Sequence, residues 1–147
     1  LPMLKRNLIM TLIAGFILST YGNAQGGEEP TTIRLVFEGG ELVVALEDNA
    51  ASRDLLSMLP LTLTFEDYNG TEKIAYPPRK LNLGDAPDRC DPEEGSFTYY
   101  APWGNLAIFY RDFRESHGLV PLGNIVSGTE ALSRMEGSFS ARLEKVK

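Results

Sequence analysis

Short runs in which apolar and polar residues alternate constrain the fold of this chain more than any other feature. Apolar residues stand at every second position of residues 33–38, namely 33, 35 and 37; a Gly-Gly pair follows, and residues 42, 44 and 46 continue this spacing. Successive side chains of a strand point to opposite faces, so each run predicts a strand with one buried face. Two such runs about a Gly-Gly pair predict a β-hairpin. Residues 61–66 and 139–144 repeat the pattern and predict two further strands.

Two short helices are predicted between the strands. Asp48 or Asn49 is a suitable cap for a helix over residues 50–59, because a short side-chain oxygen accepts from the free amides of the first turn. A proline follows and ends this helix. Ser127 and Glu130 have the spacing of a capping box and predict a second helix.

The whole pattern amounts to about seven or eight short strands and two short helices. The shorter strand candidates are residues 73–76, 97–101, 106–110 and 122–126. Many short strands at even spacing predict a barrel or a sandwich, and closure into a barrel leaves no strand edge with unpaired amides. The expected fold class is therefore mainly β, with a closed barrel and two short helices.

The first 24 residues have the order of a secretory signal peptide. The pair Lys5-Arg6 is positive, residues 8–18 are almost wholly apolar, and small residues lead to Ala24. This order predicts export to the periplasm or the extracellular space with cleavage after Ala24; an uncleaved anchor is the alternative. The expected organisation is a signal peptide at residues 1–24, a flexible lead-in at residues 25–31 and one domain at residues 32–147.

Charge and cysteine content exclude several classes of function. The formal net charge is -6 and no basic patch is visible, which disfavours nucleic-acid binding and a stable association with anionic membranes after cleavage. Cys90 is the single cysteine, so an intramolecular disulfide is excluded, and we interpret it as a bystander in a loop. The acidic loop at residues 83–95 lacks the spacing of a calcium loop, and His117 has no second histidine, so no metal site is predicted.

Four separated segments contain motifs that occur in one order: residues 50–56, 59–68, 99–113 (with Ala-Pro-Trp-Gly-Asn) and 118–128. They resemble a bacterial family of cyclophilin-like fold proteins, over roughly residues 32–145. The resemblance implies a closed β-barrel with two helices and no assigned activity. Some relatives look like parts of flavodoxin-containing proteins, which implies a flavodoxin-like redox partner. This chain shows no flavin fingerprint, so no cofactor is expected.

The cyclophilin resemblance also brings in a peptidyl-prolyl isomerase as the alternative function. True cyclophilins carry a Phe-His-Arg stretch, whose arginine hydrogen-bonds the substrate, and a Gln-Gly-Gly stretch. The first is absent here, and Gln25-Gly26-Gly27 lies in the lead-in, before the barrel. Because a fold alone does not carry a function, the primary expectation is a binding module. Whether the protein is an enzyme stays open.

Five side chains are the candidates for binding a peptide or a small molecule. Trp103 and Asn105 lie between two predicted strands, where Trp103 forms the wall of a groove or a plug over one end of the barrel. Asn105 positions a ligand carbonyl or caps the turn. Tyr110 lies in a strand, and Arg111 and Arg53 are cations that hold an anionic group or pair with surface acids.

Overall fold

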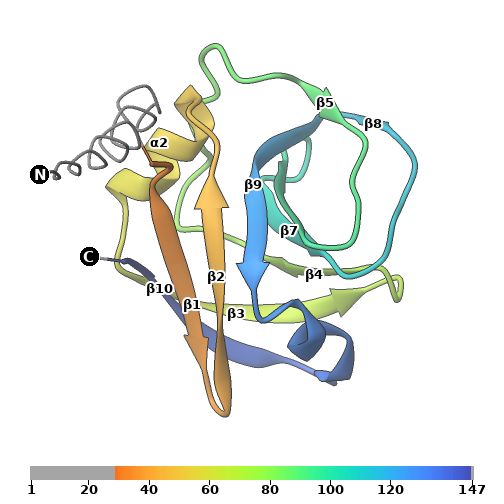
Figure 1. Cartoon of the computed structure of the whole chain (residues 1–147). Helices are drawn as coiled ribbons and strands as arrows, with labels where there is room; N and C mark the ends of the chain where they lie inside the picture. The colour runs from red at the N-terminus through yellow and green to blue at the C-terminus, as the bar shows by residue number, and fades with distance from the viewer. Residues whose placement is uncertain (1–28, 147) are drawn as a thin grey trace, which may run out of the picture.

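The computed structural model describes residues 29–146, which form a closed barrel of antiparallel strands (Figure 1). The elements are β1 (Thr32–Phe37), β2 (Gly40–Leu46), α2 (Ala50–Ser57), β3 (Leu61–Tyr68), β4 (Glu72–Ala75), β5 (Arg89–Cys90), β6 (Ser96–Tyr100), β7 (Asn105–Phe109), β8 (Ser116–His117), β9 (Leu119–Ser127), the 3-10 helix η2 (Thr129–Arg134) and β10 (Phe139–Lys145). The expected signal segment at residues 1–24 lies outside the described residues.

Eight strands make the barrel, in the order β1-β10-β3-β4-β7-β6-β9-β2. The last of these pairs with the first, since β1 and β2 form the hairpin expected about the Gly-Gly pair. Every barrel strand therefore has two antiparallel neighbours, and no backbone edge of the sheet is left open. The expectation of a mainly β fold with a closed barrel and two short helices is confirmed.

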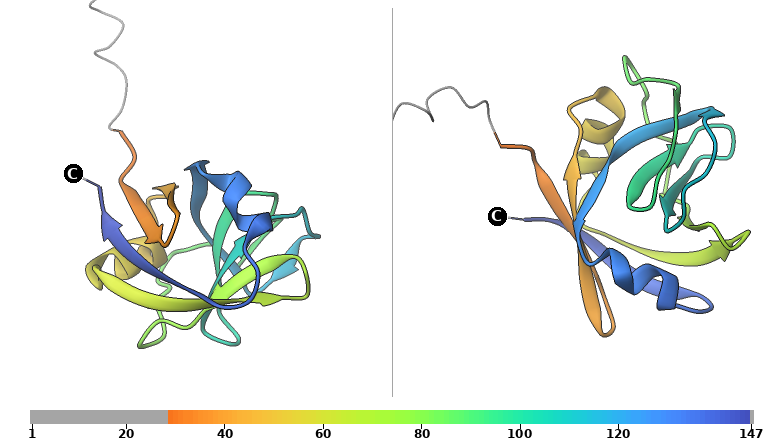
Figure 2. Two further views of the ribbon diagram at one scale, coloured as in Figure 1. Left: turned by 90° about the horizontal axis from the view of Figure 1, so that it is seen from below. Right: turned by 45° about the vertical axis from the view of Figure 1, so that its right-hand side comes forward.

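The interior of the barrel is filled by the inward residues of the alternating runs. These side chains are almost completely buried: Ile33, Leu35, Leu42, Val44, Phe65, Phe97, Leu106, Ile108, Leu122 and Leu143. The two helices lie at opposite ends of the barrel (Figure 2). Buried Leu55 of α2 and buried Leu132 of η2 join the same core, so the helices add apolar cover at both ends.

One charged side chain also lies inside. Lys73 on β4 is 2% exposed, and its ammonium donates to the carbonyl of Met135, 2.7 Å away, next to η2. The same ammonium donates to Asp67 Oδ1 at 3.3 Å and lies 4.9 Å from the ring centroid of Tyr110. These contacts compensate for the hydration that the ammonium group loses on burial, and they attach η2 to the barrel.

A second, smaller layer covers part of the outer wall. The strands β5 and β8 pair with one another and lie outside the main barrel (Figure 1). Beneath this layer, Ala107, Phe109 and Leu119 are buried on the outer face, with Phe113 packed against them. Strand β7 is therefore buried on both of its faces.

The predicted cap is confirmed for one helix and is wrong for the other. Asn49 caps α2 as expected, since its side chain accepts from Ser52 N at 2.9 Å. The capping box predicted from Ser127 and Glu130 is wrong: Ser127 ends β9, and η2 begins after Gly128 with no side-chain cap. Gly128 has φ +95°, and a Cβ there would lie 2.4 Å from the Glu41 carbonyl oxygen, so the close approach of β2 decides this local structure.

Two further expectations need adjustment. The strand expected at residues 122–126 is longer, because β9 pairs with both β2 and β6. The acidic loop at residues 83–95 includes the short strand β5. Among the described residues, no helix is long and apolar enough to cross a membrane.

Candidate functional site

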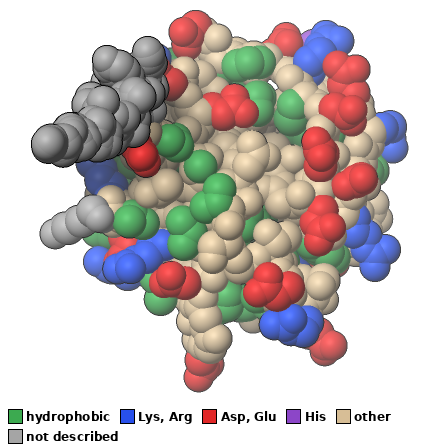
Figure 3. Space-filling model, in the orientation of Figure 1, with side chains coloured by type: hydrophobic (Ala, Val, Ile, Leu, Met, Phe, Trp, Pro, Cys, Tyr) green, Lys and Arg blue, Asp and Glu red, His purple; other side chains and the backbone are tan. Residues whose placement is uncertain are grey.

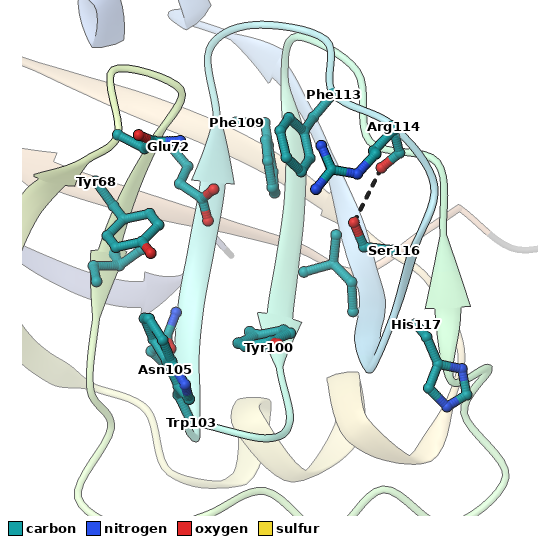
Figure 4. Close-up of a pocket in the computed structure, with 13 residues that line it drawn as sticks. Tyr68, Glu72, Tyr100, Trp103, Asn105, Phe109, Phe113, Arg114, Ser116 and His117 are labelled. Carbon is teal, nitrogen blue, oxygen red and sulfur yellow. Dashed lines mark hydrogen bonds between the residues drawn. The ribbon is translucent and has the colours of Figure 1, made fainter.

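A pocket of about 310 Å³ lies on the outer wall of the barrel, between strands β3, β4, β6 and β7 and the segment that leads into β8 (Figure 4). Aromatic side chains supply most of its apolar lining, and polar side chains enter from both sides. The lining residues are Tyr68, Asn69, Glu72, Ile74, Tyr100, Trp103, Asn105, Phe109, Phe113, Arg114, Ser116, His117 and Leu119.

Strand register brings the first group of these residues together. Tyr68 on β3 lies opposite Glu72 on β4, and Glu72 lies opposite Phe109 on β7. The hairpin between β3 and β4 turns at Asn69-Gly70, both with positive φ, and three residues separate Tyr68 from its partner Glu72. This turn fixes the register and so places the carboxyl group of Glu72 between two aromatic side chains.

The second group comes from the turn between β6 and β7. Tyr100 lies opposite Asn105, and Gly104 N donates to the Tyr100 carbonyl at 2.8 Å. Gly104 has φ +77°, a left-handed conformation that glycine adopts without strain. The tight turn holds Trp103 over the pocket and points Asn105 into the wall.

Trp103 forms an aromatic corner with two tyrosines. Its ring centroid lies 5.5 Å from that of Tyr68 at an interplanar angle of 90°, and 5.6 Å from that of Tyr100 at 77°. Trp103 is 49% exposed and Tyr68 is 41% exposed, so the corner is open to solvent on one side. It is a wall of the pocket and not a buried plug. Exposed aromatic clusters of this kind are typical of binding surfaces.

Asn105 has an unused acceptor. The residue is 1% exposed, and its Nδ2 donates to the Leu106 carbonyl at 3.0 Å. That carbonyl only accepts, so the amide group must face it with nitrogen and leave Oδ1 on the other side. Oδ1 has no donor within the described residues. The expected roles were to position a ligand carbonyl or to cap the turn, whereas the atom left without a partner is an acceptor.

Glu72 is the acid of the pocket. Burial raises its pKa to about 7, and the negative charge of Asp67 contributes in the same direction. Asp67 itself stays ionised: burial acts to raise its pKa, but hydrogen bonds from Tyr110, Gly70 and Lys73 outweigh this effect and lower it. The site therefore has one carboxyl group that changes its charge near neutral pH.

The opposite wall carries the basic side chains. The Arg114 guanidinium carbon lies 4.5 Å from the ring centroid of Phe113, and Ser116 Oγ donates to the Arg114 carbonyl at 3.1 Å (Figure 4). Arg89 Nη2 lies 2.9 Å from Nδ1 of His117. A guanidinium only donates, so Nδ1 accepts and the proton of the neutral imidazole lies on Nε2.

Two of the five predicted binding residues lie in this pocket, namely Trp103 and Asn105. Tyr110 lies outside its lining: its hydroxyl donates to Asp67 Oδ1 at 2.5 Å. Arg111 is exposed, and its guanidinium lies 6.0 Å from the ring centroid of Tyr110. Tyr110 has the opposite parity to Phe109 and therefore points away from the pocket. Arg111 lies beyond the end of β7, where strand parity no longer applies.

Arg53 lies at a different hollow, of about 390 Å³, beside α2. Its Nη1 is 2.5 Å from Asp48 Oδ1 and its Nη2 is 3.9 Å from Asp85 Oδ1. It therefore takes the surface ion pairing that was the alternative for an arginine here. The five candidates do not form one site, and a ligand role for each stays a prediction.

Several pocket residues were missed at the level of sequence, chiefly Tyr68, Glu72 and Arg114. The Asn69-Gly70 pair was a usable signal for a hairpin at this place. A two-residue turn would have paired Tyr68 with Thr71, whereas three residues separate Tyr68 from its partner Glu72, so the register itself needed the structure. Nothing comparable points to Arg114, which reaches the pocket through an irregular segment.

Cys90 is half-buried in the outer layer. Burial, together with the nearby acids Glu47, Asp91 and Glu115, raises the pKa of its thiol to about 11. A thiol in this environment stays protonated and is a weak nucleophile at neutral pH. Among the described residues, no group of three or more potential metal-ligating side chains comes together.

A closed barrel of eight antiparallel strands with a ligand-sized pocket on its outer wall is the class that this fold and site define. The sequence profile of the Cyclophilin-like family matches residues 35–144, and the chain belongs to this family. The bacterial origin suggested by the resemblance stays a prediction.

The fold is similar to that of a hypothetical protein from Archaeoglobus fulgidus whose structure was solved in solution. The TM-score is 0.63 at 20% sequence identity, over 82% of this chain and 99% of that one. At this identity the likeness concerns the fold alone. No curated protein matches the chain.

Proposed function

We propose that this domain is a binding module whose outer pocket holds a short peptide or a small molecule. The observation that carries the proposal is the unpartnered Oδ1 of Asn105. A buried acceptor without a donor costs about 1–3 kcal/mol, and a bound ligand that brings an N–H or O–H group removes this cost.

The rest of the pocket supports the same function. Its volume of about 310 Å³ is at the small end of the range for ligand sites. The half-exposed rings of Trp103 and Tyr68 offer apolar area that a ligand would cover. A few polar groups in an aromatic pocket are the usual composition of a site that fixes the orientation of its ligand.

The test is a titration of the ¹⁵N-labelled full chain, followed by NMR, with a panel of acetylated and amidated tripeptides and a set of neutral small fragments. We expect a subset to shift the signals of the Asn105 side-chain amide and the Trp103 indole N–H. Asn105→Ala should weaken those ligands about tenfold or more, because a buried hydrogen bond is lost.

The control for that variant is Asn124→Ala, which removes an exposed asparagine on β9 that does not line the pocket. Its affinities should equal those of the unchanged chain. The proposal is wrong when no probe shifts the pocket signals, or when Asn105→Ala binds the same probes equally well.

The alternative function is a divergent peptidyl-prolyl isomerase, and one observation favours it. Arg114 lines the pocket together with Phe109 and Phe113, so a cation lies close to apolar rings that would hold a proline. We expect the full chain to give no rate gain in a proline-peptide isomerisation assay. A faster isomerisation rate that is lost in Arg114→Ala would show that the protein is an isomerase and would contradict the proposed binding module.

Export belongs to the proposal as well. Residues 1–24 have the composition of a signal peptide, and they lie outside the described residues. Expression of the full chain with a C-terminal tag should give a processed product in the exported fraction. A product of full mass that stays in the cytoplasmic fraction contradicts this expectation.

A further inference from the structure

We propose that the pocket selects an organic cation with N–H groups, an alkylammonium such as a primary amine or a lysine side chain, between the aromatic corner and the carboxylate of Glu72. This inference rests on the proposed binding function and names the chemical class of the ligand. Three features carry it: ring geometry, the placement of the acceptors, and the distribution of charge.

The aromatic corner has the geometry of a cation site. Trp103 meets Tyr68 at 90° and Tyr100 at 77°, with centroid distances of 5.5 and 5.6 Å. In each of these T-shaped pairs the edge of one ring contacts the face of the other, and the ring faces that are not covered in this way remain for a ligand. The face of an aromatic ring carries negative potential and attracts a cation within about 6 Å of its centroid. The exposure of Trp103 and Tyr68 leaves that space accessible.

Two acceptors line the same pocket. Glu72 lies opposite Tyr68 in the strand register, and Asn105 lies opposite Tyr100. Figure 4 shows both side chains on the part of the pocket that carries Tyr68 and Trp103. An ammonium group has three N–H donors and no acceptor, so it donates charge-assisted hydrogen bonds to the Glu72 carboxylate beside the rings. Asn105 lies four residues from Phe109, the partner of Glu72 on β7, which is about 13 Å along the strand, so the same nitrogen does not bridge both acceptors. A quaternary ammonium group lacks these donors and leaves the Glu72 carboxylate without a hydrogen bond.

Charge separates the two halves of the pocket. The cations lie on the opposite wall, where Arg114 stacks on Phe113 and Arg89 contacts the imidazole of His117. A bound cation therefore lies toward Glu72 and away from Arg114. The chain has a formal net charge of -6, and acidic side chains are spread over the face in Figure 3, so the wider field also attracts cations.

The chain contains a reporter for the test, because Trp103 is its only tryptophan. The intrinsic fluorescence of the full chain is followed at pH 8 while n-butylammonium chloride is added, with sodium chloride as the ionic control. The neutral probe of the same length is n-butanol, and butyltrimethylammonium lacks the N–H groups. We expect n-butylammonium to bind at least about tenfold more tightly than either, because it alone donates charge-assisted hydrogen bonds to the Glu72 carboxylate.

Two variants locate the contribution of each wall. Glu72→Gln should weaken n-butylammonium about tenfold, since it removes the counter-charge and keeps the shape. Tyr68→Leu keeps apolar area but removes a ring face, and it should weaken n-butylammonium severalfold and leave n-butanol unchanged. The matched control is Glu41→Gln, which removes an exposed carboxylate on β2 outside the pocket and should have no effect.

The outcomes separate this inference from the binding function on which it rests. Equal affinity for n-butanol and n-butylammonium, or an unchanged affinity for n-butylammonium in Glu72→Gln, overturns the selection for cations. Binding of neutral peptides in the same experiment would still support the proposed binding function. Tighter binding of butyltrimethylammonium overturns the requirement for N–H groups. The absence of binding by every probe and every tripeptide rejects both proposals.

Discussion

The two faces of strand β7 are built for different purposes. Leu106 and Ile108 point into the barrel, are completely buried and belong to its apolar core. Asn105 and Phe109 point outward into the pocket, where one acceptor lacks a partner among the described residues. The inner face supplies cohesion through close packing. The outer face carries a buried amide with an unused acceptor, beside the exposed rings of Trp103 and Tyr68, and both features lower stability and favour a ligand.

Truncation inside the barrel should give the largest effect. Leu106→Ala removes a fully buried side chain from the core, and we expect it to lower the free energy of unfolding by about 3 kcal/mol. Urea denaturation measures this loss. On the outer face, Trp103→Leu should lower it by only about 1 kcal/mol or less, because half of the ring is already in solvent. Equal losses would contradict the division between the faces.

Substituting alanine for one glycine in the barrel wall and for one beside the pocket compares how closely the backbone packs in the two regions. At Gly123, a Cβ would lie 2.3 Å from the Ala45 carbonyl oxygen, so Gly123→Ala must separate β9 from β2 and should destabilise by about 2 kcal/mol or more. At Gly104, beside the pocket, the nearest atoms are 3.5 Å away in Lys80, and the substitution carries mainly the strain of the left-handed conformation, about 1 kcal/mol.

Thermal unfolding of the two alanine variants gives the ranking. The barrel seam between β2 and β9 should tolerate the methyl group less well than the turn beside Trp103. A smaller shift in melting temperature at Gly123 than at Gly104 would show that the seam relaxes easily.

The charge of Glu72 should make the stability of the outer face depend on pH. Its pKa in the folded protein, about 7, is above the ordinary value of 4.5, so its favourable contribution is complete below pH 4.5 and is lost as the pH rises through 7. Glu72→Gln resembles the protonated form at every pH. The variant should therefore gain stability over the unchanged chain between pH 4.5 and 8, by about 1 kcal/mol once solvent screening is considered.

Denaturation midpoints of both proteins across that pH range measure the difference. The other carboxyl groups are common to both chains, so their titration cancels. A difference that stays constant with pH, as we expect for Glu41→Gln, would show that Glu72 titrates as an ordinary surface acid.

The smallest effect is expected at Tyr110, which was a predicted ligand residue and lies outside the pocket. Tyr110→Phe removes the hydrogen bond to Asp67, and we expect a loss of about 1 kcal/mol in unfolding free energy. The affinity of the pocket for n-butylammonium should not change. A clear loss of affinity would extend the site beyond its present lining.

Alternation predicted the strands because it depends only on neighbouring residues. Ile33, Leu35 and Phe65 are buried as that pattern requires. The order of the strands needed more information: β9 pairs with β2 and β6, which are distant in sequence. Local patterns do not specify such pairings, and the capping box at Ser127 failed because a contact with β2 overrode it.

The site followed the same division. Trp103 and Asn105 were found from sequence because one short turn presents both of them. Glu72 entered through a strand register, and Arg114 through an irregular segment folded over the outer wall, so both depended on tertiary structure. Arg53 and Arg111 were selected for their chemistry alone, and the fold places them away from this pocket.

The buried amine of Lys73 can report the rate at which the end of the barrel covered by η2 opens to solvent. An acylating reagent modifies only a free, accessible amine, and this one is attached to the carbonyl of Met135 beneath η2. Lys73 is modified only after η2 and Met135 move away from the barrel, whereas the exposed amine of Lys80 is modified without any opening. The ratio of the two labelling rates would measure how often the native protein opens locally at η2.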